Sequence, residues 1–416
     1  MSSSERIVIV GAGQAASELA ASLRKNGWGG QVTVVGDEPY LPYQRPPLSK
    51  AFLNGEITEA SLLLKPHKAW AEAAVEIRTG TRVEAIDRVA RRVLLSGGEA
   101  LDYGQLALTV GGRPRALQAD GMEAAGRARN FHYLRTITDV HRIQEQIKPG
   151  ASLVVIGGGY VGLEVAAVAI GRSMRVTVLE AAPRVLARVT VPAISDFYER
   201  AHREAGVNVR TGVMVTAVET DEATGLVTAV VCNDGTRIEA DAVIVGVGLL
   251  PNVELADAAG LAVDNGIVVD EYARTSDESI VAAGDCTNHP SASTGTRLRL
   301  ESVPNAIEQA RTAAATLCGK QVPYRAVPWF WSDQYDLKLK SVGLSLGHDQ
   351  IVLRGSTEKR AFAAFYLKGD RVVGADTISR PQEFMIARRL VAERISVDPA
   401  LLADDTVNLK TLLPAA

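Results

Sequence analysis

The segment IVIVGAGQAA at residues 7–16 decides the fold, and the segment LVVIGGGYVG at residues 153–162 repeats its pattern. In each, four apolar residues predict a buried parallel strand, and the small residues after them predict a tight turn into a helix. Such a turn lets the backbone approach a pyrophosphate at a helix N-terminus. One glycine fingerprint is a weak signal, but two copies indicate two dinucleotide-binding regions.

An acidic residue follows each fingerprint at the end of the next apolar segment. Asp37 follows QVTVVG at residues 31–36, and Glu180 follows RVTVL at residues 175–179. Each carboxylate is placed to accept hydrogen bonds from an adenosine ribose. A 2′-phosphate about 4 Å from Glu180 would cost roughly 1 to 4 kcal/mol, which favours NADH over NADPH. The nearby Arg184 and Arg188 leave a phosphate site open as the alternative.

Length and composition agree with a large α/β protein. The 416 residues exceed what one core supports, and 47% hydrophobic residues with 37 glycines suit two or three domains with many turns. The longest apolar run, residues 242–250, is too short to span a membrane. The N-terminus lacks a basic region followed by a long apolar region, so we expect a cytoplasmic protein.

The cysteines and histidines do not indicate a metal site. Three scattered cysteines, Cys232, Cys286 and Cys318, are too few for a disulfide framework or a metal cage and are expected to be small buried residues. The six histidines lack metal-ligand spacing, so they are expected at the surface or in packing. We expect no metal in this chain.

Later glycine turns divide the chain into domains. The segments at residues 106–115 and 242–252 repeat a strand followed by a glycine turn, and each closes one nucleotide-binding region. Prolines and the aromatic run at residues 329–331 mark a further boundary. We predict a discontinuous FAD-binding domain at residues 1–114 and 247–325, an NAD-binding domain at residues 115–246, and a C-terminal interface domain at residues 326–416.

Several ordered motifs give the chain a family resemblance: RPPLSK at residues 45–50, GLE at 162–164, GD at 284–285, ESVPNA at 301–306 and PWFWSDQY at 328–335. With both fingerprints, the chain resembles the FAD-dependent pyridine-nucleotide oxidoreductases, and more closely the reductases of two-iron, two-sulfur ferredoxins. The resemblance covers nearly the whole chain. It implies two Rossmann-like domains of the glutathione-reductase type and a C-terminal α+β domain.

The resemblance also implies the residues that contact each cofactor. FAD, bound non-covalently, is expected against Gly11, Gly13, Ala15, Asp37, Lys50, Val83, Arg135, Asp285 and Val303. NADH is expected against Gly157, Gly159, Tyr160, Gly162, Glu164 and Glu180. Of these, Val83, Arg135, Tyr160 and Val303 rest on the resemblance alone. The Gly-Asp pair that includes Asp285 is by itself an ordinary turn, and after two dinucleotide folds it is interpreted as binding the flavin's ribityl hydroxyls.

We interpret Lys50 and Glu164 as a catalytic tuning pair. Two prolines precede Lys50, and Ser49-Lys50 is expected to open a helix. An ammonium beside the isoalloxazine would stabilise negative charge as the ring accepts a hydride. Glu164 is placed to face both Lys50 and the nicotinamide carboxamide. The alternative for Lys50 is a rigid turn with a solvated side chain.

The segment at residues 40–64 contains no cysteine, so no dithiol relay operates there. Electrons must therefore leave the flavin directly, to a partner protein or a small acceptor. From Lys320 to Ala416 the chain has 14 Lys+Arg against 11 Asp+Glu, which tilts this region basic. Such a face would steer an acidic ferredoxin. We place Arg311 and Lys410 at that face by resemblance, and Trp329 and Trp331 with them, although Arg311 fits a solvated helix residue nearly as well.

The sequence therefore predicts an NADH-dependent FAD flavoprotein that reduces a two-iron, two-sulfur ferredoxin and binds neither nucleic acid nor membrane. The ferredoxin would supply an oxygenase, foremost a haem-thiolate monooxygenase, with a ring-hydroxylating dioxygenase as the alternative. Two other classes stay open. A self-contained NADH oxidase would consume dioxygen or another small acceptor without a partner, and a non-enzymatic FAD protein would show negligible turnover.

Overall fold

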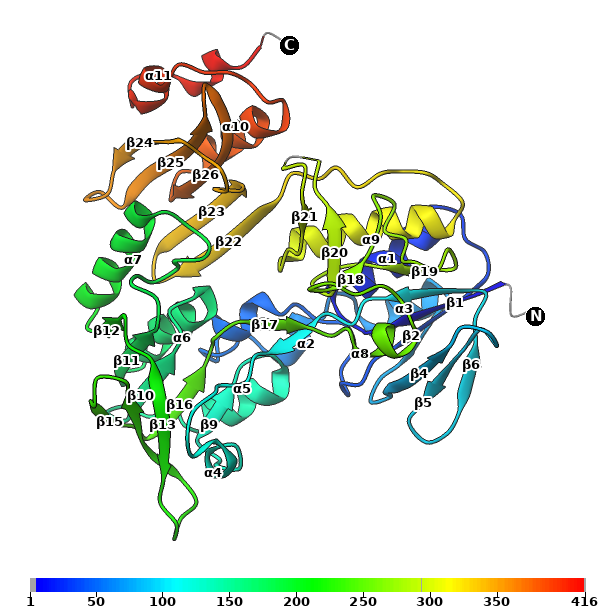
Figure 1. Cartoon of the computed structure of the whole chain (residues 1–416), viewed down its shortest axis with the longest axis horizontal. Coiled ribbons are helices and arrows are strands. Elements are labelled where there is room, and N and C mark those ends of the chain that lie inside the picture. Colours follow the sequence, from blue (N-terminus) through cyan, green and yellow to red (C-terminus); the bar gives the residue numbers. More distant parts are fainter. Residues whose placement is uncertain (1–4, 293, 415–416) are drawn as a thin grey trace. The chain divides into compact units, whose positions relative to one another are not determined.

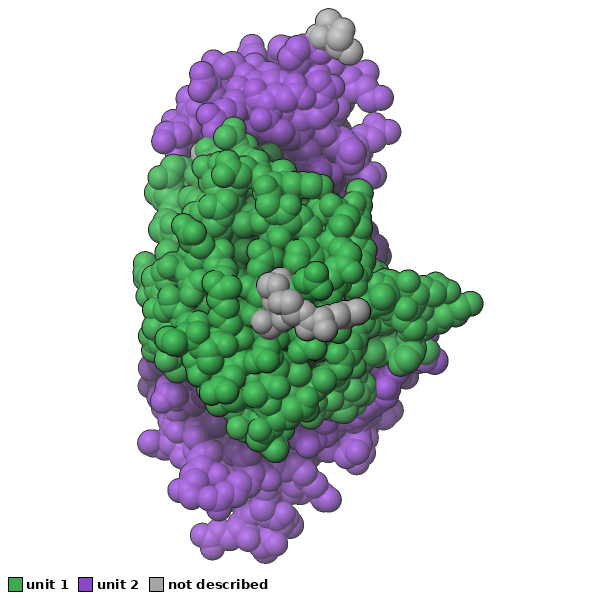
Figure 2. Space-filling view, turned by 90° about the vertical axis from the view of Figure 1, so that its right-hand side faces the viewer, with its two compact units in different colours: residues 1–44, 60–113, 250–328 green, residues 45–59, 114–249, 329–416 purple. Residues whose placement is uncertain are grey.

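The structure is a computed structural model of the chain that describes residues 5–292 and 294–414. The chain divides into two compact units, coloured separately in Figure 2. Unit 1 comprises residues 1–44, 60–113 and 250–328, and unit 2 comprises residues 45–59, 114–249 and 329–416. The predicted three-domain division stays a prediction.

The first fingerprint strand lies at the centre of a parallel sheet in unit 1 (Figure 1). The strand order is β19-β7-β1-β2-β3. These strands are β1 (Arg6–Val10), β2 (Gln31–Val35), β3 (Val75–Arg78), β7 (Gln105–Leu108) and β19 (Ile280–Ala282). The apolar residues of β1 are buried, as expected for a parallel strand covered on both faces.

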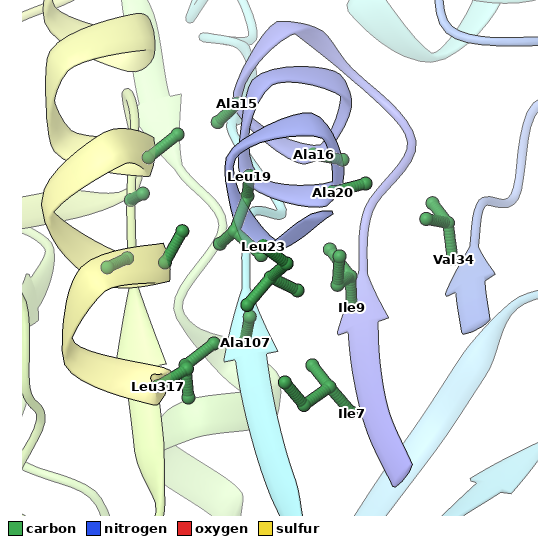
Figure 3. Packing of buried hydrophobic residues seen from close by; sticks show 14 of the residues in the cluster. Ile7, Ile9, Ala15, Ala16, Leu19, Ala20, Leu23, Val34, Ala107 and Leu317 are labelled. Atoms are coloured by element: carbon green, nitrogen blue, oxygen red, sulfur yellow. The ribbon is translucent and has the colours of Figure 1, made fainter. Parts of the chain in front are cut away.

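Helices α1 (Gln14–Lys25) and α9 (Val303–Leu317) contribute to the core of unit 1, which Figure 3 shows from close by. Leu19 and Leu23 lie one turn apart on α1 and are fully buried with Ile9 of β1. Burying each of these leucines contributes about 1.5 to 3 kcal/mol. This packing fixes the start of α1, and therefore the glycine turn, against the sheet.

The remaining elements of unit 1 are short. They are α3 (His67–Glu72), α8 (Glu254–Ala258), the antiparallel sheet of β4 (Val83–Asp87), β5 (Arg92–Leu95) and β6 (Ala100–Asp102), and the sheet of β18 (Ile267–Val268), β20 (Thr287–Pro290) and β21 (Arg297–Leu298). Three more lie where the chain passes between the units: α2 (Glu59–Leu62), β8 (Gly112–Pro114) and β17 (Leu249–Pro251).

A second parallel sheet, in unit 2, has the strand order β12-β11-β10-β16-β9. Its strands are β9 (Phe131–Tyr133), β10 (Ser152–Ile156), β11 (Arg175–Glu180), β12 (Asn208–Thr211) and β16 (Ala242–Val245). The second fingerprint strand, β10, is central, as β1 is in unit 1. In both sheets one neighbour leads to the predicted acidic residue, with β11 ending at Glu180 and β2 ending two residues before Asp37, and the other neighbour leads into the later glycine turn. The repeat predicted from the sequence is therefore a repeat of topology.

The other elements of residues 45–59 and 114–249 come before, between and after the strands of this parallel sheet along the chain. They are the short 3₁₀ helix η2 (Pro46–Ser49), the helices α4 (Met122–Ala125), α5 (Ile137–Gln144), α6 (Tyr160–Gly171) and α7 (Pro192–Glu204), and the antiparallel sheet of β13 (Val215–Thr220), β14 (Val227–Cys232) and β15 (Arg237–Glu239).

The C-terminal part of unit 2 is a five-stranded antiparallel sheet with the order β22-β23-β26-β25-β24. Its elements are β22 (Trp329–Gln334), β23 (Leu337–Gly343), β24 (Gln350–Ser356), β25 (Ala361–Lys368), β26 (Arg371–Ile378), α10 (Pro381–Ala392), α11 (Pro399–Ala403) and the 3₁₀ helix η3 (Leu409–Leu412). Helix α10 packs against β26 and β23. The predicted fold class, two dinucleotide-binding α/β regions with a C-terminal α+β region, is confirmed.

Candidate functional site

The first glycine turn joins β1 to α1 in unit 1. Gly11 has a φ of +99°, and a Cβ there would lie 2.4 Å from the Thr109 carbonyl oxygen, so the fold itself requires glycine. Gly13, the N-cap of α1, differs: its backbone is extended, and a Cβ would meet no atom within 4 Å. Packing does not explain this glycine, whereas the close approach of a pyrophosphate does. The turn therefore fits a dinucleotide.

The other FAD residues predicted in unit 1 lie on several elements. Gly284 has a φ of +93°, and a Cβ there would lie 3.4 Å from the Ala15 Cβ and 3.7 Å from the Ala306 Cβ. The Gly-Asp turn thus meets the start of α1 and the start of α9, which brings together the predicted residues Gly13, Ala15, Asp285 and Val303. Asp37 is exposed two residues after β2, and Val83 is buried in β4.

Two predicted FAD residues, Lys50 and Arg135, belong to unit 2. Arg135 lies between β9 and α5. Its backbone N–H donates to Asp139 Oδ2 at 3.0 Å, and its carbonyl accepts from Arg45 Nη1 at 2.7 Å. Asp139 also completes the capping box of α5, so this stretch is held rigidly.

The second glycine turn joins β10 to α6 in unit 2 and repeats the first. Gly157 has a φ of +111°, and a Cβ there would lie 2.4 Å from the Gly246 carbonyl oxygen. At Gly162 a Cβ would lie 2.1 Å from the Gly157 carbonyl oxygen, whereas Gly159 has no atom within 4 Å of that position. Packing within the protein again does not require the middle glycine, Gly159, whereas the close approach of a pyrophosphate does. This turn therefore also fits a dinucleotide.

Glu180 ends β11 beside this turn. Its carboxylate accepts hydrogen bonds from the backbone N–H of Gly158 at 2.6 Å and of Ala182 at 2.7 Å. These bonds fix the acid at the turn that would hold the pyrophosphate. This is the position from which a carboxylate reaches an adenosine ribose.

Lys50 and Glu164 form an ion pair, with Nζ 2.8 Å from Oε2. Ser49 Oγ donates to the same oxygen at 2.5 Å, and Ser332 Oγ donates to Oε1 at 2.6 Å. Glu164 is 3% exposed, so its charge depends on these donors. Burial raises the pKa of Glu164, while Lys50 and the two serine hydroxyls act to lower it. The predicted contact between Lys50 and Glu164 is present, and its role stays a prediction.

The helix predicted to open at Ser49-Lys50 is absent, and that expectation was wrong. Pro46 and Pro47 instead start the 3₁₀ helix η2, which ends at Ser49 with Lys50 as its C-cap. The Lys50 backbone N–H closes this turn on the Pro47 carbonyl at 3.0 Å, and its Nζ also donates to the Pro46 carbonyl at 3.2 Å. The short turn aims the ammonium at Glu164.

Strand β22 packs on α6 and reaches the same site. Tyr160 and Glu164 lie one turn apart on α6, and Phe330 and Ser332 lie two residues apart on β22, so each pair shares a face. The Tyr160 and Phe330 rings are 4.7 Å apart, and Ser332 bonds Glu164. Sequence analysis missed Ser332, although its alternation with Phe330 in a strand was a usable signal.

The four residues predicted at the partner face fall in two places. Trp329 and Trp331 are half-buried on β22 with their rings 5.5 Å apart, and Lys410 is exposed in η3. Arg311, on α9 of unit 1, is 52% exposed and forms ion pairs with Glu18 at 2.8 Å and Glu308 at 2.7 Å. Their role stays a prediction.

The cysteines agree with the expected packing: Cys232 and Cys286 are buried and Cys318 is partly buried, and all three are free. Among the described residues, no group of three or more His, Cys, Asp or Glu side chains is placed to hold a metal ion. In residues 5–292 and 294–414, no helix combines the length and the apolar character needed to cross a membrane.

Comparison with known proteins shows which families and relatives the chain matches. Residues 5–310 match the family described as pyridine nucleotide-disulphide oxidoreductase, and residues 329–413 match the one described as reductase C-terminal. The chain is 52% identical to putidaredoxin reductase CamA of Pseudomonas putida over 100% of this chain and 98% of the relative.

Two solved structures are also similar. The first is a covalent putidaredoxin reductase–putidaredoxin complex, with a TM-score of 0.95, 52% identity and coverage of 98% of this chain and 97% of that one. The second is the ferredoxin reductase for the CYP199A2 system of Rhodopseudomonas palustris, with a TM-score of 0.94, 41% identity and coverage of 98% and 99%.

Proposed function

The chain belongs to the pyridine nucleotide-disulphide oxidoreductase family, and we propose that it carries electrons from NADH through FAD to a two-iron, two-sulfur ferredoxin. It is an oxidoreductase that uses FAD and NADH. The observation that carries the proposal is the pair of glycine turns, in which Gly13 and Gly159 are each left without a packing reason. A relative solved in complex with putidaredoxin supports a ferredoxin as the acceptor.

When bound, FAD would supply the redox chemistry between NADH and the acceptor. The chain's own residues orient the reacting groups and stabilise the charge that develops on them. The Lys50 ammonium stabilises negative charge that develops beside it, and Glu164 holds that ammonium in place through the 2.8 Å ion pair. Because the chain has no cysteine at residues 40–64, electrons do not pass through a dithiol in that segment.

Direct assay tests the proposal. Purified protein with NADH should reduce cytochrome c rapidly only when a two-iron, two-sulfur ferredoxin is added, and it should show the visible spectrum of bound flavin. Rapid oxygen consumption without ferredoxin would identify an NADH oxidase instead. Negligible flavin reduction by NADH would identify a non-enzymatic FAD protein.

Substituting Glu180 with arginine is expected to shift nucleotide preference toward NADPH, because it replaces a ribose acceptor with a phosphate donor. The ratio of kcat/KM for NADPH to that for NADH should rise by about 10- to 100-fold. Glu180→Gln is the control for loss of charge without a new cation, since its amide oxygen keeps an acceptor for one of the two backbone N–H groups that Glu180 binds. An unchanged ratio in Glu180→Arg would show that this side chain does not contact the ribose.

We propose that Arg311 of unit 1 and Trp329, Trp331 and Lys410 of unit 2 contact the ferredoxin. The exposed Lys410 ammonium would attract an acidic ferredoxin, and the half-buried tryptophans would exclude water from the contact. Because Arg311 is already paired with Glu18 and Glu308, its replacement by an acid would leave three carboxylates together.

Charge reversal at Arg311 or Lys410 is therefore expected to slow ferredoxin reduction about tenfold at low salt and to weaken its dependence on salt. The rate of flavin reduction by NADH should be unchanged, which stopped-flow absorbance measures separately. Lys148→Glu, at another exposed lysine, is the control for net charge. Equal losses in both steps would indicate damage to the fold instead of the docking face.

We propose a haem-thiolate monooxygenase as the oxygenase downstream of the ferredoxin. The support is the likeness to the reductase for the CYP199A2 system. A ring-hydroxylating dioxygenase is the alternative outcome. Reconstitution with the ferredoxin and each oxygenase class, measuring product per NADH, separates the two.

A further inference from the structure

A chain of hydrogen bonds leads away from Glu164 through side chains that the proposed reaction does not use. Ser332 Oγ lies 2.6 Å from Glu164 Oε1, and Gln334 Nε2 lies 3.2 Å from Ser332 Oγ. Gln334 Oε1 lies 2.8 Å from His202 Nε2, and His202 Nδ1 lies 2.8 Å from the Tyr335 hydroxyl. All of these residues belong to unit 2. They connect β22 and α7 to the candidate site on α6.

This chain of hydrogen bonds is shielded from water along most of its length. Ser332 and His202 are 0% exposed and Gln334 is 1% exposed, so each polar atom depends on its protein partner. Only Tyr335, at the far end, is partly exposed. Its φ of +55° is unusual for a non-glycine residue, so the surrounding structure holds this tyrosine in a strained conformation.

The charge of Glu164 sets the direction of every bond in this chain. Three donors, the Lys50 ammonium and the two serine hydroxyls, converge on its carboxylate, which fits the ionised state. An ionised carboxylate can only accept hydrogen bonds, so the Ser332 hydroxyl must donate its single proton to Glu164. Its oxygen can then only accept from Gln334, which must present its amide N–H₂ to Ser332 and its carbonyl to His202.

His202 must then carry its proton on Nε2, where it donates to Gln334. Burial lowers the pKa of His202, so the ring is neutral and has only this one N–H. Nδ1 is left as an acceptor for the Tyr335 hydroxyl. Each donor from Tyr335 to Ser332 therefore points toward Glu164, and the reverse direction would leave Glu164 Oε1 buried without a donor.

We propose that Ser332, Gln334 and His202 are positioning residues that hold Glu164 ionised and correctly oriented, by fixing the hydroxyl that donates to its Oε1. The proposal rests on the proposed function of Glu164 in hydride transfer. It assigns strand β22 of the C-terminal sheet a part in the chemistry of the nucleotide-binding region, beyond any part in partner docking.

The direction of these hydrogen bonds can be measured without enzyme turnover. In the holoprotein labelled with ¹⁵N-histidine, the NMR signal of His202 is identified by its loss in His202→Asn. That signal should be the one of a neutral Nε2–H tautomer from about pH 6 to 8. This measurement stands even if NADH proves not to be the electron donor. An Nδ1–H tautomer or a protonated ring at His202 would overturn the proposal.

The effect on Glu164 is measured by anaerobic stopped-flow reduction with NADH. Ser332→Ala should lower the limiting rate about tenfold and Gln334→Met about 3- to 10-fold, with the Kd for NADH unchanged. The matched control is Thr377→Val, which removes a buried hydroxyl of the same sheet that donates to the Lys340 carbonyl, outside the chain. A limiting rate in Gln334→Met equal to that of Thr377→Val would contradict the positioning role.

Discussion

Replacing Gly159 with valine is expected to raise the Kd for NADH by about 10- to 100-fold while leaving the flavin content unchanged. Gly159 has an extended backbone that any residue adopts, with no atom within 4 Å of a Cβ position, so we expect the fold to accommodate a side chain there. The valine instead occupies the space that the NADH pyrophosphate needs. Titration of NADH against the purified holoprotein measures the change.

Gly13→Val is the mirror experiment at the first turn. Its backbone is likewise extended and its Cβ position open, so the variant should fold but release FAD, with a Kd raised by a similar factor. Gly11→Ala serves as the contrast. Its Cβ would clash with the Thr109 carbonyl oxygen at a positive φ, so it should lower the free energy of unfolding, by about 1 to 3 kcal/mol. Loss of FAD in Gly159→Val, or of NADH binding alone in Gly13→Val, would reverse the assignment of the two turns.

The two turns could be predicted from sequence because each is decided by neighbours in the chain. Four apolar residues, a glycine at positive φ and a helix start fall within ten residues, and the acids Asp37 and Glu180 follow after the next apolar segment. Local patterns of this kind do not depend on the rest of the fold. The repeated strand order of the two sheets follows from them, since each first strand needs neighbours on both sides.

The surroundings of Lys50 and Glu164 could not be predicted in the same way. Two successive prolines shorten the segment before Lys50 into a 3₁₀ turn, a choice that local propensity does not distinguish from a helix start. Ser332 is 168 positions from Glu164, and Gln334 is 132 positions from His202. Such pairs arise only when β22 lies against α6 and α7. The sequence therefore indicated the contact between Lys50 and Glu164 but missed the Ser332 hydroxyl that also binds Glu164.

Lys50→Met is expected to slow flavin reduction by NADH about 100-fold, because it removes the cation that stabilises developing negative charge. It also leaves Glu164 buried without its ion-pair partner. Removing one member of a buried pair costs about 3 to 5 kcal/mol in the free energy of unfolding. Stopped-flow reduction and denaturant unfolding measure the two effects.

The stability loss in Lys50→Met should depend on pH in a defined direction. Burial already raises the pKa of Glu164 above its ordinary value, and removal of Lys50, which acts to lower it, raises it further. A carboxyl whose pKa is higher in the folded state than in the unfolded state loses stability as pH rises through that folded pKa. The difference in unfolding free energy from wild type should therefore be small near pH 5 and grow toward pH 8. A loss that is constant over this range would show that Glu164 does not titrate with the loss of its partner.

The double variant Lys50→Met/Glu164→Gln separates stability from chemistry. With both charges removed, no buried carboxylate lacks a cation, and the amide oxygen can accept from one of the two serine hydroxyls while the amide N–H₂ donates to the oxygen of the other. Most of the unfolding free energy lost in Lys50→Met should return, and its dependence on pH should disappear. Flavin reduction should stay about 100-fold slow, since the Lys50 ammonium is still missing. Recovery of the reduction rate together with stability would mean that Lys50 acts only by neutralising Glu164, and not on the developing charge of the reaction.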